Sequence, residues 1–128
     1  MSGNPILSWN HQGVLFPIDP RSKATSRNRS PYKVSLNDFV LQFSTSPDRQ
    51  NLLSGLLSFR SALQGAGISA GFQWIDGSFL ERVESLRSCS PNDIDVVTFY
   101  ILPVGQTQQT LAATHPQLFD HDYLKNNY

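Results

Sequence analysis

The segment from Phe72 to Val97 constrains the fold of this chain more than any other, because it joins two apolar stretches through a polar connection. In the first stretch, residues 68–76, apolar side chains alternate with polar residues or glycine, which is the period of a β-strand. The second stretch, residues 94–102, is an almost continuous apolar run and predicts a strand that is buried on both faces.

Helical patterns flank both predicted strands. A capping box from Ser35 to Asp38 opens a predicted helix at 36–43, and Pro47 opens a longer helix that Gly65 ends. Two further helices are predicted at 79–88 and 106–114. The sequence therefore predicts an α/β (or α+β) fold, in which a small mixed sheet has flanking helices.

The chain is short enough to form one globular domain. Its 128 residues can bury roughly two-thirds of the surface of the unfolded chain, which is enough for one core. Residues 1–33 are rich in Pro, Ser, Asn and Arg, and they are predicted to form an arm that docks on the core through Trp9 and the run 14–16. Residues 34–128 are predicted to be the domain itself.

The overall charge favours no particular partner. Ten basic and ten acidic residues cancel, so no overall field draws the chain to nucleic acid or to a membrane. The stretch from Arg21 to Lys33 differs, because it contains five basic residues and no acid. It is interpreted either as a solvated arm or as a loop that holds phosphates.

The cysteine content indicates the compartment. Cys89 is the only cysteine, which excludes an internal disulfide and is typical of a reducing environment. The sequence contains no apolar run of about 18 residues, and its opening residues do not have the pattern of a secretory signal. A soluble cytoplasmic protein without a membrane partner is therefore predicted.

The turn Gly77-Ser78 follows the first predicted strand. Ser78 precedes Glu81 by three residues, so one interpretation is that Ser78 only caps the helix predicted at 79–88. The same geometry would present free N–H groups and the positive end of the helix dipole to a phosphate. Gly77, without a side chain, would let that phosphate approach the backbone.

Two acids, Asp93 and Asp95, stand at the start of the second predicted strand. Residues two apart in a strand point to the same face, so the two carboxylates would repel each other unless they are solvated or bridged by a cation. Mg²⁺ prefers such hard oxygen ligands. The alternative is a turn at Pro91-Asn92-Asp93, which accounts for Asp93 but not for Asp95 within the apolar run.

The order strand, Gly-Ser, helix, Asp-x-Asp, strand resembles the signature of the DNA polymerase beta-like nucleotidyltransferase superfamily. Gly77 and Ser78 match the turn that holds the triphosphate in this superfamily, and Asp93 and Asp95 match the pair that binds the metals. The resemblance implies that the acidic pair faces the Gly-Ser turn. It also implies binding of a nucleoside triphosphate (NTP) with Mg²⁺ and transfer of a nucleotidyl group to an unknown hydroxyl acceptor.

The wider sequence is similar to an uncharacterised bacterial family with this fold. This similarity rests on residues 71–100 and on Arg-Ser-Pro-Tyr at 29–32, and it covers roughly residues 10–128. Within this picture, Arg82 or the basic stretch would neutralise phosphate charge.

The sequence departs from the superfamily in its third carboxylate, which is expected on a following strand. Asp120 and Asp122 are candidates by position only, so the third acid lies after Tyr128 or the site is degenerate. A degenerate version would be a catalytically inactive binding or assembly module that acts through oligomerisation. A sheet of two strands would have an open edge and exposed apolar surface, so a homodimer or higher homo-oligomer is expected.

Overall fold

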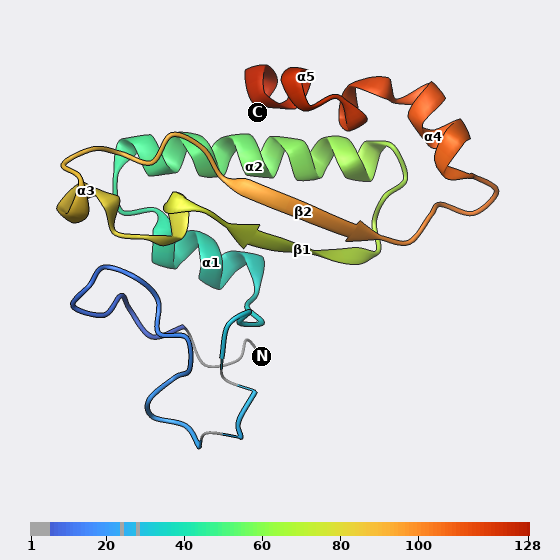
Figure 1. Ribbon diagram of the computed structural model, residues 1–128. Helices are drawn as coiled ribbons and strands as arrows, with labels where there is room; N and C mark the ends of the chain where they lie inside the picture. Colours follow the sequence, from blue (N-terminus) through green and yellow to red (C-terminus); the bar gives the residue numbers. More distant parts are fainter. Residues whose placement is uncertain (1–5, 24, 28) are drawn as a thin grey trace. The chain divides into compact units, whose positions relative to one another are not determined.

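The computed structural model describes residues 6–23, 25–27 and 29–128 (Figure 1). In chain order its elements are α1 (Leu36–Phe43), α2 (Pro47–Gly65), β1 (Gly71–Asp76), the 3-10 turn η1 (Ser78–Leu80), α3 (Val83–Leu86), β2 (Asp95–Tyr100), α4 (Gln108–Thr114), the 3-10 turn η2 (Pro116–Phe119) and α5 (His121–Asn127). A small sheet with helices was predicted, and the structure confirms it. Residues 1–5, 24 and 28 of the predicted arm lie outside the described residues.

The chain divides into two compact units, each made from two separate parts of the sequence. The first unit comprises Met1–Gln50 and Ile75–Asp95, and the second comprises Asn51–Trp74 and Val96–Tyr128. The candidate site residues Gly77, Ser78, Arg82, Asp93 and Asp95 all belong to the first unit.

Aromatic side chains form the core of the first unit. α1 places Phe39 and Phe43 four residues apart on one face, and both are buried. Their ring centroids lie 5.9 and 5.8 Å from the ring of Phe79 in η1. Ser35 caps α1 as predicted, because its Oγ accepts a hydrogen bond from the N–H of Asp38 at 3.1 Å. This core holds the segment that follows β1.

The N-terminal arm docks on the same core, as the sequence predicts. The indole of Trp9 lies edge-on to Phe43, with 5.9 Å between the ring centroids. The described part of the basic stretch contains no helix, in agreement with the prediction of a loop. Arg21 in this stretch forms an ion pair with the buried Asp19 at 2.7 Å, so it is occupied by an acid of the protein itself.

The second unit is built around α2, from Asn51 onward. Its core consists of Leu63, Ala66, Ile68, Leu111 and Leu118, from α2, the following loop, α4 and η2. α2 ends at Gly65 as predicted, and Gly67 follows with a φ of 89°, which glycine adopts without strain. β1 begins at Gly71 rather than at residue 68, because Ile68 packs in this helical core instead.

β1 and β2 pair in an antiparallel two-stranded sheet. The N–H of Ile101 donates to the carbonyl of Ala70 at 3.0 Å. The side-chain amide of Gln73 donates to the hydroxyl of Thr98, also at 3.0 Å. These two contacts fix the register of the strands.

The two faces of this sheet differ in exposure. The alternate β2 residues Val96, Thr98 and Tyr100 are half-buried. Arg60 of α2 donates to the side chain of Gln73 at 2.7 Å, so α2 lies on the half-buried face. Val97 and Phe99 on the other face are exposed, so the prediction that this strand is buried on both faces is wrong. An apolar run does not by itself tell a covered face from an uncovered one.

The C-terminal part of the second unit is helical (Figure 1). Asp120 caps α5, because its Oδ1 accepts a hydrogen bond from the N–H of Tyr123 at 3.1 Å. Asp122 lies in the first turn of the same helix, so the two positional candidates for a third carboxylate stand at a helix start and not on a strand. In the part of the chain that the structure describes, no helix combines the length and the apolar character needed to cross a bilayer.

Candidate phosphate and metal site

Gly77 connects β1 to η1, and the structure gives two reasons why glycine is needed there. Its backbone has a φ of 89° and a ψ of −171°, a combination that is open mainly to glycine. A Cβ built at this position would lie 2.4 Å from Oδ2 and 3.1 Å from Cγ of Asp95. The Asp95 carboxylate therefore rests against the backbone of the Gly-Ser turn, so this acid and the turn are neighbours as predicted.

A further acid, Asp76, lies across the sheet from Asp95. The antiparallel register pairs the last residue of β1 with the first residue of β2, and both side chains are exposed. Cβ atoms of directly opposed residues are about 4.5–5.5 Å apart, and like charges in such a pair repel. Sequence analysis missed Asp76. Pairing the end of one predicted strand with the start of the next would have found it.

Asp93 precedes β2, which begins at Asp95. The alternation of side chains along a strand therefore fixes the direction of Asp95 alone. Both residues are exposed, and neither carboxylate forms a hydrogen bond or ion pair with a residue that the structure describes. Among residues 6–23, 25–27 and 29–128, no three His, Cys, Asp or Glu side chains are grouped so as to hold a metal ion.

The prediction of a helix at 79–88 is wrong, because two short elements form in its place. Ser78–Leu80 is a 3-10 turn, and Val83–Leu86 is a single α-helical turn. Gly77 rather than Ser78 occupies the N-cap position of the first piece, and no side chain caps it. The predicted capping box is therefore absent at this turn. A three-residue turn also has a much smaller dipole than the expected helix.

The N–H groups of the turn divide into occupied and unoccupied ones. The N–H of Gly77 donates to Oδ1 of the preceding residue, Asp76, at 2.8 Å. Those of Leu80 and Glu81 donate to carbonyls within the turn at 3.1 and 3.0 Å. The first two residues of η1 are Ser78 and Phe79, and the turn has no carbonyl that can accept a hydrogen bond from their N–H groups. Phe79 is fully buried, so the N–H of Ser78 is the one of these two groups that a phosphate could reach.

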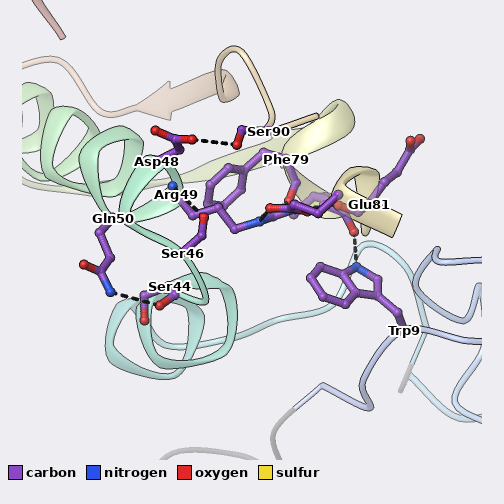
Figure 2. Close-up of polar contacts among 11 residues, drawn as sticks. Trp9, Ser44, Ser46, Asp48, Arg49, Gln50, Phe79, Glu81 and Ser90 are labelled. Atoms are coloured by element: carbon purple, nitrogen blue, oxygen red, sulfur yellow. Dashed lines mark hydrogen bonds and ion pairs between the residues drawn. The ribbon is translucent and has the colours of Figure 1, made fainter. Parts of the chain in front are cut away.

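Side chains from other parts of the unit donate hydrogen bonds to carbonyls that a continuous helix would use for its own backbone hydrogen bonds. Arg49 donates to the carbonyls of Phe79 and Glu81, both at 2.6 Å (Figure 2). The indole N–H of Trp9 donates to the carbonyl of Leu80, also at 2.6 Å. In an α-helix each of these carbonyls would accept from the N–H four residues later. Because three consecutive carbonyls bind side chains instead, the helix is interrupted.

Arg49, at the first turn of α2, is fully buried and stands at the centre of this arrangement (Figure 2). Its Nε and Nη2 bind the two carboxylate oxygens of Glu84 at 2.7 and 3.1 Å, a bidentate geometry. The guanidinium also lies 5.2 and 4.9 Å from the ring centroids of Trp9 and Phe79. Arg49 therefore fixes the segment that follows the Gly-Ser turn.

The sequence did not single out Arg49, although a signal exists. It lies four residues before Leu53 and seven before Leu56, both of which are buried, so it belongs to the buried stripe of α2. A charged residue on such a stripe needs a partner. The hydrogen bonds from Arg49 hold the pKa of Glu84 below its usual value, while burial acts more weakly in the opposite direction. The pair is therefore fully charged at neutral pH.

Arg82 follows the interrupted segment and stands at the N-cap of α3. Its backbone N–H donates to the carbonyl of Gly13 at 2.8 Å. Its side-chain Nε is buried and has no hydrogen-bond partner within the described part of the chain. A buried donor without a partner costs about 1–3 kcal/mol, so this group suits a water or an anion. No described contact joins Arg82 to Gly77 or Ser78.

Comparison with known proteins places this chain in one family. Residues 7–128 match the profile described as "Family of unknown function (DUF6932)", and the chain belongs to this family. No curated protein and no solved structure matches the chain. The family description assigns no activity, so the resemblance to nucleotidyltransferases stays a prediction.

Proposed function

We propose that the Gly77-Ser78 turn and the neighbouring acids bind an NTP with Mg²⁺. In an active form the site would transfer a nucleotidyl group to a hydroxyl acceptor. The contact between the Asp95 carboxylate and the backbone of Gly77 carries this proposal. Mg²⁺ is usually held by one or two carboxylates together with substrate phosphates, so a carboxylate beside the Gly-Ser turn has the required chemistry.

Each residue of the site has a role in this proposal. Asp93 and Asp95 would hold Mg²⁺ through their free carboxylates, whose hard oxygens suit this ion. The N–H group of Ser78 would donate to a phosphate oxygen. Arg82, whose Nε is buried without a partner, would neutralise phosphate charge. Such a site acts mainly by positioning and by charge stabilisation, on which phosphoryl transfer depends.

Asp76 supports the proposal through electrostatics. The strand register places it directly opposite Asp95, and like charges at opposed positions repel each other. A divalent cation relieves this repulsion. The Asp76→Asn variant is therefore expected to weaken Mg²⁺ binding.

Titration calorimetry with Mg²⁺ and each of ATP, CTP, GTP and UTP tests the proposal. We expect binding heat with wild-type protein and its loss in the double variant Asp93→Ala/Asp95→Ala. Asp38→Ala, which removes an acid from the first turn of α1, is the control and should keep the heat. Absence of heat in the wild type, or equal heat in the double variant, would contradict nucleotide binding.

A second function, an assembly module that acts through oligomerisation, is favoured by the sheet. Its two described strands each have an open edge, and neither strand contains the lysine or proline that often protects such an edge. One face of the sheet is apolar and exposed. Light scattering coupled to size-exclusion chromatography should show a homodimer or larger species, and a monomer at every concentration would count against this function.

A further inference from the structure

Five apolar side chains lie exposed on one face of the β1–β2 sheet, all within the second unit. They are Phe72 (57%), Trp74 (51%), Val97 (54%), Phe99 (39%) and Ile101 (68%), with their exposed fractions in parentheses. They alternate along the two strands and the residue that follows β2, so they point to the same side. This set is called the aromatic face below.

The three rings of the aromatic face form one preformed surface. Phe72 and Phe99 stack across the strands with 4.8 Å between centroids and 17° between planes. Trp74 meets Phe99 edge-on at 4.9 Å. Rings that already pack against one another lose little rotamer freedom when a partner covers them, which favours binding.

We propose that the aromatic face binds the same face of a second copy of this chain, in a two-fold symmetric dimer. Such an interface uses one patch on both copies, so the patch must be complementary to itself. This inference rests on the second proposed function, oligomerisation, and adds the surface through which it occurs. It is independent of nucleotide binding.

The exposed area suits a dimer of this kind. A half-exposed aromatic side chain presents roughly 100 Å². With the two aliphatic side chains, the face presents on the order of 500 Å² of apolar surface, at the upper end of what monomers expose. A stable interface needs about 800 Å² from each partner, of which the apolar core is one part and a polar rim the rest. The aromatic face is the size of such a core.

Charge also favours a second copy over other occupants. None of the five side chains is charged, so the core of the paired faces contains no charge, while Asp76 and Asp95, which alternate in phase with them at the end of the two strands, would stand at its rim. The chain has a formal net charge of zero at pH 7, so two copies do not repel each other. A nucleic acid or an acidic peptide would find no cation on this face.

Trp74→Thr and Val97→Thr test the inference. Threonine has a high strand propensity and is close to valine in shape, so both variants should keep the fold, as far-UV circular dichroism can check. Sedimentation velocity over a range of concentrations should show a dimer dissociation constant raised at least about tenfold by Trp74→Thr. Val97→Thr should raise it by less. Leu41→Gln, which removes an exposed leucine of α1 in the first unit, is the control and should leave it unchanged.

Intrinsic fluorescence gives a second measurement that needs no disruptive variant. Burial of Trp74 in the dimer should shift the emission of the wild type to the blue as its concentration rises, and should reduce quenching by acrylamide. Trp74→Phe should keep the dimer but remove this change, because Trp9 is then the only tryptophan.

The outcomes separate the inference from the function on which it rests. A dimer that both threonine variants leave intact would overturn the aromatic face as the interface but keep oligomerisation, with edge pairing as the remaining mode. A wild type that stays monomeric would overturn both. A dissociation constant raised by the two face variants and not by the control supports both.

Discussion

The segment that follows β1 and the aromatic face of the sheet are opposite cases of side-chain burial. In the segment, a charged side chain, Arg49, is completely buried and three carbonyls around it are paired. On the aromatic face, Trp74 and Phe99 are exposed although no polar group requires it. The comparison teaches that the partners available to a side chain, and not its polarity alone, decide its burial.

The two regions also separate the two proposed functions. The Gly-Ser turn and its acids belong to the first unit, and the aromatic face belongs to the second. Asp76 and Asp95 lie on the same strands as the aromatic face, two residues from Trp74 and Val97, so each variant of one region should also be tested for the function of the other. If the buried contacts of the segment stabilise the fold and the exposed side chains of the aromatic face do not, substitutions in the segment should cost more unfolding free energy.

Arg49→Ala should have the largest effect. It leaves two carbonyls and the Glu84 carboxylate without their donor, and removing one partner of a buried ion pair costs about 3–5 kcal/mol. Urea denaturation followed by circular dichroism measures the free energy of unfolding. Arg87→Ala, which breaks an exposed ion pair with Glu81 at 3.5 Å, is the control and should cost less than about 1 kcal/mol. Equal losses in the free energy of unfolding would show that the buried Arg49 contributes no more to stability than an exposed arginine.

Gly77→Ala should be the next most damaging change, at about 1–3 kcal/mol, because it combines a positive φ with a clash. Adding Asp95→Ala removes the clashing carboxylate, so the double variant should be more stable than the sum of the single effects predicts. Gly65→Ala is the matched control, since a Cβ there meets nothing within 4 Å. Strict additivity at Gly77 and Asp95 would mean that the two residues are not in contact.

Acid should weaken the first unit through Glu84. Its pKa is lowered in the folded protein, mainly by hydrogen bonds from Arg49, so the ionised form contributes stability above the pKa of the unfolded chain. That contribution is lost as the pH falls through the lower folded value. Unfolding free energies measured from neutral to acidic pH should fall less steeply in Glu84→Gln than in the wild type. The same slope in both proteins would remove Glu84 as a source of acid sensitivity.

Val97→Thr should have the smallest effect on the stability of the monomer. The side chain is exposed, and surface substitutions away from special features usually stay within about 0.5 kcal/mol. Thermal unfolding at a concentration where the protein is monomeric measures this. A loss comparable to that of Gly77→Ala would show that the aromatic face is already covered within one chain.

Local signals predicted the regular elements well. α1 and α2 have the predicted bounds, because a capping serine before Leu36, a proline at position 47 and a glycine at position 65 act within a few residues of the helix ends. Both strands were also found, with shorter bounds than predicted. The resemblance to nucleotidyltransferases implied the closeness of Asp95 to the Gly77 turn, whereas the need for glycine there, which comes from its positive φ and the nearby carboxylate, was not predicted.

The errors have one physical origin. The residues at 79–88 are suitable for a helix, but Arg49 and Trp9 form hydrogen bonds with three of the carbonyls that the helix would need. The run 94–102 is apolar enough for two buried faces, but one face is exposed. Asp76 escaped notice because strand pairing, and not sequence spacing, brings it opposite Asp95. In each case the deciding partner lies elsewhere in the sequence.

The sequence by itself determined where α1 and α2 begin and end and which stretches form strands. These features depend on contacts within about four residues along the chain. Only the tertiary structure decided that the segment after the Gly77-Ser78 turn is not a helix and that one apolar sheet face is exposed. The carbonyl of Phe79 has a donor 30 residues away in the sequence, and such a partner can be assigned only once the chain has folded.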